Sequence, residues 1–137
     1  MRLRSLLFVP GDRPDRMEKA LGCGADALIL DLEDSVTHNA KRMARQATAD
    51  FLRHAKGRIR LLVRVNPLDS GLQDDDLSAI LGAQPEGLVL PKAEGASNVE
   101  ALGLLASGIP ILPIATETPA AIFQLGTYAS VSAKLLG

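Results

Sequence analysis

The chain has 137 residues, of which 47% are hydrophobic and 23% charged, and its formal net charge is −1. These values are typical of one ordinary globular domain. The near-zero charge and the scarcity of aromatic residues argue against a nucleic-acid surface or an anionic-membrane surface. Cys23 is the single cysteine, which excludes an internal disulfide and favours a reducing, cytoplasmic setting.

The N-terminal apolar run predicts neither an export signal nor a membrane span. It covers residues 6–9 and ends at Pro10 and Gly11, whereas a secretory signal needs roughly 7–15 apolar residues. A bilayer span needs about 18, and the chain has no run of that length. We therefore expect a cytoplasmic protein without membrane contact.

Short apolar runs alternate with helical segments along the chain. The runs predict strands at residues 5–9, 27–31, 60–65, 87–90 and 111–115. Helices are predicted at residues 12–22, 39–56, 75–81 and 98–106, with a further one from residue 119. Asp12 is expected to cap the first helix, and Pro119 to open the last at a position where its missing N–H costs little.

This alternation of apolar strands and helices predicts an α/β fold with a parallel sheet. Two architectures fit the pattern, a doubly wound open sheet and a (β/α)₈ barrel. No Gly-x-Gly-x-x-Gly follows the first strand and no Gly-Lys-Ser/Thr occurs. The nucleotide-binding forms of the open sheet therefore lose support.

Ionisable residues follow every predicted strand. Ligands of α/β proteins gather at the carboxyl ends of the strands, so we interpret these residues as a ligand site. The alternative is that strand ends meet solvent, where polar residues are common. In chain order the residues are Asp12, Arg13 and Arg16; Asp31, Glu33 and Asp34; Arg64; Lys92 and Glu94; and Glu117.

Five motifs at these strand ends match a known family in order and spacing. They are SLLFVPG at 5–11, GAD at 24–26 with LILDLED at 28–34, VRVN at 63–66, LPK at 90–92 and ETP at 117–119. The chain resembles the citrate lyase beta-subunit-like branch of the HpcH/HpaI aldolase superfamily, which includes malyl-CoA and citramalyl-CoA lyases. The resemblance implies that residues 1–137 form the N-terminal part of a single (β/α)₈ barrel, with about the first five βα units present.

The same resemblance implies a Mg²⁺-dependent carbon–carbon lyase. Such an enzyme cleaves a citryl-, malyl- or citramalyl-CoA type of 3-hydroxyacyl-CoA into acetyl-CoA and an oxo-acid. A thioesterase on the same scaffold is a near variant. A metal-dependent pyruvate or oxo-acid aldolase and a truncated, non-catalytic module remain as alternatives. Family members assemble as trimers or hexamers, which implies a homo-oligomer.

The resemblance assigns roles to the charged residues at the strand ends. Glu117 matches the family's first metal-binding carboxylate, which also lies beside the substrate. Arg64 matches the arginine that binds the substrate carboxylate, and its planar fork suits a bidentate contact. Asp34, with Glu33 as a second candidate, lies where the family keeps acidic groups that order metal-bound water and orient this arginine.

Three basic residues complete the candidate site. Lys92 is expected to add positive charge beside the pocket, with a catalytic role. Arg13 and Arg16, after the first strand, are candidates for contacts to the phosphates of CoA. For Arg16, an ion pair with Asp12 on the same helix is equally open. Helix N-termini favour anions in any case.

Structural roles are expected for other charged residues. The set Lys41, Arg42 and Arg45 predicts a solvated helix face, and the acidic run at residues 74–76 is expected to cap a helix rather than bind metal. A structural and a functional role stay equally open for Asp31, and the structural one is preferred for Glu33.

The length of the chain limits the expected activity. A complete barrel needs about 200 residues or more, and the resemblance places a second metal-binding aspartate shortly after the point equivalent to Gly137. We therefore expect weak Mg²⁺ binding and little lyase activity from the 137-residue chain alone. We interpret the 137 residues as a fragment of a longer enzyme. The alternative is a natural half-barrel that is completed by dimerisation or is not active at all.

Overall fold

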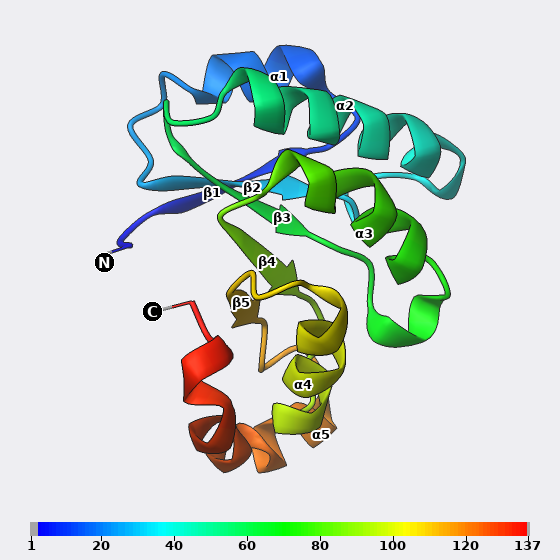
Figure 1. Ribbon diagram of the computed structural model, residues 1–137, viewed down its shortest axis with the longest axis vertical. Helices are drawn as coiled ribbons and strands as arrows, with labels where there is room; N and C mark the ends of the chain where they lie inside the picture. The colour runs from blue at the N-terminus through cyan, green and yellow to red at the C-terminus, as the bar shows by residue number, and fades with distance from the viewer. Residues whose placement is uncertain (1–2, 137) are drawn as a thin grey trace.

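Five parallel strands in sequential order, β1-β2-β3-β4-β5, form the sheet in the computed structural model, which describes residues 3–136 (Figure 1). They are β1 (Leu6–Pro10), β2 (Ala27–Asp31), β3 (Arg60–Arg64), β4 (Gly87–Leu90) and β5 (Ile111–Pro113). Every neighbouring pair is parallel. Sequential order is the order of a (β/α)₈ barrel, whereas a doubly wound sheet reverses direction at a switch point. The barrel prediction is confirmed for these five units.

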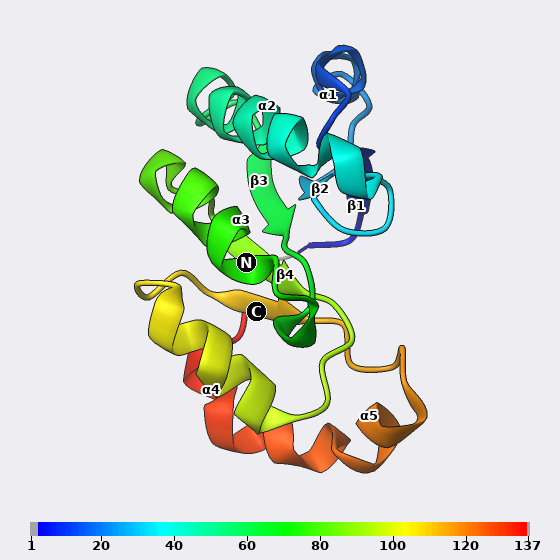
Figure 2. The ribbon, with the colours of Figure 1, turned by 90° about the vertical axis from the view of Figure 1, so that its right-hand side faces the viewer.

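The helices lie along one face of the curved sheet, as Figures 1 and 2 show. They are α1 (Pro14–Ala20), α2 (Lys41–His54), α3 (Gln73–Ile80), α4 (Ala96–Leu105) and α5 (Pro119–Phe123), followed by the 3₁₀ segment η4 (Leu125–Lys134). Among the described residues, no helix is both long and apolar enough to cross a membrane.

The central strands β2, β3 and β4 are mainly apolar because both of their faces are packed, whereas Leu6, Leu7 and Phe8 of β1 are exposed. Alternate residues point to opposite faces of a strand. The outward set lies in the main core under the helices and includes Leu28, Leu30, Leu61, Val63, Leu88 and Leu90. The inward set forms a separate cluster of Ile29, Leu62 and Val89, against which Leu112, Ile114 and Leu136 pack.

The strand register arranges the inward side chains in layers. One layer is apolar, because Ile29 pairs with Phe8 on one side and Leu62 on the other. Two residues further along each strand, Asp31 is paired in register with Arg64. On β2 and β3 the charged residues therefore lie one layer above the apolar one, at a level to which β1 and β4 contribute Pro10 and Val89.

Gly11 brings the end of β1 close to β2. Its N–H donates to the carbonyl of Asp31 at 2.8 Å. A Cβ at this position would lie 2.7 Å from that carbonyl oxygen and 2.8 Å from Thr48 Oγ1. Only glycine fits without displacing backbone, which explains the glycine of the SLLFVPG motif.

The boundaries of α1 to α4 differ by one or two residues from the predicted ranges, and neither predicted N-terminal cap is observed. Asp12 does not cap α1, because Arg13 occupies the N-cap position, no side chain caps the helix, and Pro14 is its first residue. The acidic run does not cap α3 either: the helix begins at Gln73, so residues 74–76 lie inside its first turn, where the helix dipole favours them as expected. A further parallel contact beyond β5 was not predicted: Leu135 pairs with Ile111, and the Leu136 N–H donates to the Ile111 carbonyl at 2.9 Å.

Candidate active site at the carboxyl ends of the strands

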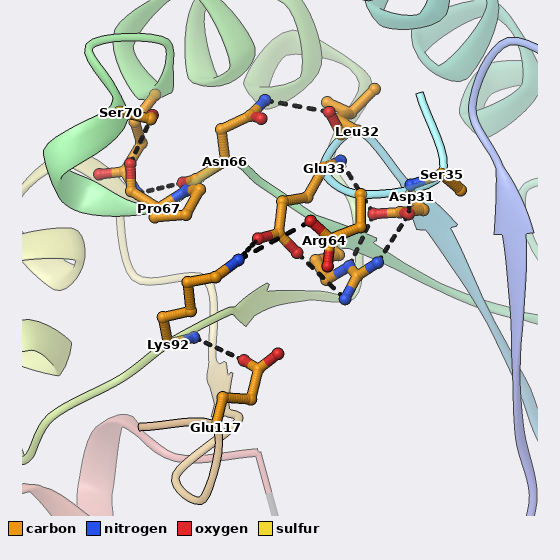
Figure 3. Close-up of polar contacts among 12 residues, drawn as sticks. Asp31, Leu32, Glu33, Ser35, Arg64, Asn66, Pro67, Ser70, Lys92 and Glu117 are labelled. Atoms are coloured by element: carbon orange, nitrogen blue, oxygen red, sulfur yellow. Dashed lines mark hydrogen bonds and ion pairs between the residues drawn. The ribbon is translucent and has the colours of Figure 1, made fainter. Parts of the chain in front are cut away.

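Arg64, the last residue of β3, lies at the centre of the polar cluster (Figure 3). Its Nε donates to Asp31 Oδ1 at 2.6 Å and its Nη2 to Asp31 Oδ2 at 2.7 Å. Below it, the ring of Phe8 lies 4.6 Å from the guanidinium carbon. This bidentate pair and the cation–π contact fix the plane of the guanidinium.

Asp31 is held in its ionised form although only 1% of it is exposed. Burial opposes the charge, but hydrogen bonds from Arg64, Ser35 and the Glu33 N–H outweigh it and lower the pKa of Asp31 to about 2. The same pair raises the pKa of Arg64 despite its own burial. Arg64 therefore stays cationic and oriented before any ligand arrives.

Glu33 joins Arg64 to Lys92. Its carboxylate is 4% exposed and has Oε2 3.1 Å from Arg64 Nη1, while Oε1 accepts a hydrogen bond from Lys92 Nζ. This hydrogen bond raises the pKa of Lys92. One buried carboxylate thus lies between two cations from β3 and from the loop after β4.

Lys92 also holds Glu117 in place through its backbone. Its N–H donates to Glu117 Oε2 at 2.6 Å, and its φ of 51° lies in the left-handed region, which is uncommon for a residue with a side chain. Strained backbone of this kind clusters at functional sites. Through Lys92, the ends of β2, β4 and β5 converge on one point, as Figure 3 shows.

Asp34 lies at the rim of this cluster. Its side chain is 68% exposed, and Oδ1 is 3.8 Å from Lys92 Nζ. The contacts that orient Arg64 come instead from Asp31 and Glu33. Asp34 therefore faces solvent beside the cluster.

Arg13 and Arg16 lie after β1, away from the contacts just described. Arg13 forms a bidentate pair with Asp15 at 2.8 and 2.9 Å, and both are exposed. This pair lowers the pKa of Asp15 to about 2 and raises that of Arg13. Arg16 is exposed and borders an open groove of about 470 Å³ between β1 and α1, which Lys19 and Phe8 also line.

A network beneath the cluster was not predicted from the sequence. The prediction of a solvated face was wrong for Lys41 and Arg45, which point from α2 toward the rest of the protein. Lys41 Nζ donates to acceptors just after β2 and β3, and Arg45 Nε donates to Asp76 Oδ1 at 2.7 Å. Asp76 is 0% exposed, and its Oδ2 accepts from the N–H and the Nδ2 of Asn66 at 2.7 Å each. The spacing of Lys41 and Arg45, four residues apart on one helix face, was the available signal.

The donor set fits one part of a Mg²⁺ site. Mg²⁺ takes oxygen ligands, usually one or two carboxylates with water and substrate. Glu117 offers an exposed carboxylate whose Oε2 already accepts from Lys92. No group of three or more metal-ligating side chains occurs within residues 3–136, so Glu117 could hold Mg²⁺ only together with other oxygen donors.

The fold and these side chains define the class of the protein: a parallel (β/α)₈-type barrel with an arginine-centred, carboxylate-rich site at the strand ends. Residues 4–110 match the HpcH/HpaI aldolase/citrate lyase family. The chain belongs to this family.

Relatives with curated names cover several activities. The chain is 38% identical over 109 residues to a (3S)-malyl-CoA thioesterase of Cereibacter sphaeroides, a match that covers 79% of the chain and 38% of the relative. It is 34% identical to citrate lyase subunit beta of Haemophilus influenzae, covering 98% of the chain and 50% of the relative. The mitochondrial citramalyl-CoA lyase of Rattus norvegicus is 36% identical, with 71% and 30% covered. The chain thus spans half or less of the length of these relatives.

Solved structures of related proteins carry ligands of the expected kind. Protein CitE from Mycobacterium tuberculosis in complex with magnesium and pyruvate superposes with a TM-score of 0.79 at 32% identity, covering 96% of the chain and 52% of that protein. The citrate lyase beta subunit of M. tuberculosis complexed with oxaloacetate and magnesium gives 0.77 at 33% identity, with 93% and 53% covered.

Proposed function

We propose that the complete protein is a Mg²⁺-dependent carbon–carbon lyase that cleaves a 3-hydroxyacyl-CoA of the citryl-, malyl- or citramalyl-CoA type. The observation that carries the proposal is Arg64, whose side chain is 12% exposed at the strand ends and is held in a fixed plane by Asp31. A fixed, permanently charged guanidinium at the mouth of a barrel is suited to an anionic substrate.

Arg64 has donors left for a substrate carboxylate. A guanidinium carries five N–H groups, and the contacts to Asp31 and Glu33 engage three of its nitrogen atoms. The N–H groups that these contacts leave free belong to Nη1 and Nη2 and lie at the end of the guanidinium that is opposite Nε. We infer that the carboxylate of the oxo-acid part binds there, end-on, and shares Nη1 with Glu33.

Glu117 is our candidate for the metal ligand from this part of the chain. Bound Mg²⁺ would polarise the oxygen on the carbon that becomes the oxo-acid carbonyl. The N–H of Lys92 fixes the direction of the Glu117 carboxylate before metal arrives. The Lys92 ammonium, whose pKa is raised by Glu33, adds a positive charge beside the developing negative charge of the substrate.

The remaining candidates lie at the rim. Asp34 faces solvent next to Lys92 and is placed to order water there. Arg13 and Arg16, exposed after β1, are our candidates for the CoA phosphates. For Arg13 this requires exchange of its exposed partner Asp15 for a phosphate, which a guanidinium can also bind in a bidentate manner.

The proposed reaction is a retro-Claisen cleavage. A base removes the proton of the 3-hydroxyl group, and the carbon–oxygen double bond of the oxo-acid forms as the bond between C2 and C3 breaks. The electron pair moves to C2 and the thioester carbonyl, and protonation of C2 gives acetyl-CoA. Within this scheme Arg64 orients the substrate and Lys92 stabilises negative charge.

Thioester hydrolysis is a second candidate, favoured by the 38% identity to a (3S)-malyl-CoA thioesterase. In that reaction water attacks the thioester carbonyl and releases free CoA and the hydroxy acid. Product analysis separates the two. Malyl-CoA yields glyoxylate and acetyl-CoA from a lyase, and malate and CoA from a thioesterase.

Isothermal titration of oxaloacetate or pyruvate into the complete gene product, with and without Mg²⁺, tests the site. We expect oxo-acid binding only with Mg²⁺, and its loss in both Arg64→Ala and Glu117→Ala. Arg53→Ala is the matched control, because Arg53 forms an exposed ion pair with Asp50 on α2. Unchanged binding in both site variants would overturn the proposal.

A further inference from the structure

Lys41 sends its ammonium from the outer helix layer to the loop that carries Glu33. Its Nζ donates to the carbonyls of Leu32 and Glu33 at 2.6 and 2.7 Å, and to Asn66 Oδ1 at 2.9 Å. These three acceptors use all three ammonium hydrogens. Within residues 3–136, no carboxylate lies at ion-pair distance from Lys41.

The loop after β2 is therefore held on both sides of its backbone. Asp31 accepts from the N–H groups of Glu33 and Ser35 at 2.9 and 3.0 Å. Lys41 donates to the carbonyls of the same loop. The N–H and the carbonyl of Glu33 are thus both fixed, and from this backbone its side chain extends toward Arg64 and Lys92 (Figure 3).

The third contact of Lys41 ties this loop to β3. Asn66, which accepts from Lys41, also donates its Nδ2 to the Leu32 carbonyl at 3.0 Å and to Asp76 at 2.7 Å. Asp76 is held by Arg45, four residues after Lys41 on α2. One face of α2 thus fixes the ends of two strands, and every hydrogen-bonding group in the connection has a partner, which favours rigidity.

We propose that Lys41 is a positioning residue of the candidate site. By holding the carbonyls of Leu32 and Glu33, it sets the direction of the Glu33 carboxylate, and through Glu33 the positions of the Arg64 and Lys92 side chains. The inference rests on the proposed function only where it concerns substrate binding. Lys41 itself touches neither Arg64 nor Lys92 within hydrogen-bond distance, so its effect is transmitted by the loop.

Three variants of the complete gene product test this assignment. Lys41→Met removes the three hydrogen bonds and keeps the apolar stem, and Lys41→Arg restores donors and charge. Arg42→Met is the matched control, because Arg42 is the exposed neighbour on the same helix. Two quantities are measured: amide hydrogen exchange at Glu33 and Ser35, and the Kd for oxaloacetate in the presence of Mg²⁺.

We expect Lys41→Met to speed exchange of both loop amides at least about tenfold, with exchange in β4 unchanged. Loss of such outer contacts typically weakens a metal site roughly 10- to 100-fold, so the oxaloacetate Kd should rise by a factor in that range. Lys41→Arg should recover most of both effects, and Arg42→Met should match the wild type.

The outcomes separate this proposal from the proposed function. Faster exchange with an unchanged Kd would make Lys41 purely structural and overturn the proposal, as would unchanged exchange in a folded Lys41→Met protein. If the wild type binds no oxo-acid, the proposed function fails, while the exchange data still decide whether Lys41 positions the loop. Should Lys41→Met not fold, Lys41→Gln, which keeps a shorter donor, is measured in its place against the same criteria.

Discussion

Asp31 and Arg64 are direct partners in the β2–β3 ladder, and their side chains form a bidentate ion pair across the same pair of strands. The backbone register therefore places the carboxylate opposite the guanidinium without help from a loop. A one-residue shift of register would turn one of the two side chains to the other face of the sheet. The pairing of β2 with β3 therefore determines the geometry of the Asp31–Arg64 contact.

Asp31→Asn should be strongly destabilising. Asparagine keeps the shape of the side chain but removes the charge and directs an NH₂ group at the guanidinium. Removing one partner of a buried ion pair costs about 3–5 kcal/mol, and Asp31 is 1% exposed. Urea unfolding measures this loss. Asp34→Asn is the control, since Asp34 is 68% exposed and should change stability by less than about 0.5 kcal/mol. Equal effects of the two variants would contradict the assignment of Asp31 as the buried partner.

Acid should remove the contribution of Asp31 to stability in a defined pH window. Its folded-state pKa, about 2, is depressed below the ordinary value for an unfolded chain, about 3.9. The contribution is therefore complete above about pH 4 and is lost as the pH falls toward 2. Its size is about 2–3 kcal/mol. Unfolding of wild type and Asp31→Asn between pH 6 and pH 2 measures it, and a stability difference that stays constant across that range would contradict this prediction.

Salt should distinguish the two carboxylates whose pKa is lowered to about 2. Asp15 and Arg13 form an exposed pair, whereas Asp31 and Arg64 are buried. Exposed charges are screened by salt and buried ones much less. An NMR titration of the carboxyl carbons in low and in 1 M salt should move the pKa of Asp15 toward its ordinary value and leave that of Asp31 nearly unchanged. Equal movement of both would contradict the burial argument.

Gly11→Ala should destabilise the chain by about 1–3 kcal/mol, as overpacking does. The added Cβ would lie 2.7 Å from the Asp31 carbonyl oxygen, which is backbone and cannot move aside cheaply. Gly82→Ala is the control, because its Cβ would meet nothing within 4 Å. That substitution is expected to be neutral or to stabilise by up to about 1 kcal/mol. Thermal unfolding of both variants checks the contrast, and a Gly11→Ala protein as stable as Gly82→Ala would contradict it.

Substitutions at Lys92 should separate its backbone from its side chain. Lys92→Gly adopts the left-handed conformation freely and keeps the N–H that Glu117 accepts, but loses the contact to Glu33. Lys92→Val loses the same contact and adds a strain of roughly 1–2 kcal/mol. We expect the valine variant to be less stable than the glycine variant in urea unfolding. The reverse order would argue against a left-handed Lys92.

The fold was largely predictable because the strands are apolar runs that punctuate the chain regularly. Each of the five strands was placed within one or two residues. The absence of nucleotide-binding glycine motifs favoured a barrel, and the sequential strand order confirms it. The N-terminus of α1 was mispredicted because Asp12 and Pro14 are competing start signals, and the proline determines where the helix begins.

The site was predictable only as a list of strand-end residues. The sequence indicated that Arg64, Lys92 and Glu117 follow neighbouring strands, but not that Glu33 bridges two of them from the interior. Charged residues on a helix are usually solvated, so Lys41 was assigned to the surface. Its inward direction depends on acceptors at the ends of β2 and β3, which become visible only after the chain has folded.

The two inward layers of the sheet divide the sequence into positions with different freedom to vary. Leu62 belongs to the apolar layer, and Arg64, two residues later on the same strand, belongs to the charged one. The two positions are about 7 Å apart along the strand. Substitution in the lower layer therefore affects folding alone, whereas substitution in the upper layer affects the site and, through the Asp31–Arg64 pair, stability as well. The substitutions tolerated at each position of β2 and β3 should therefore differ between an assay of folding and an assay of activity.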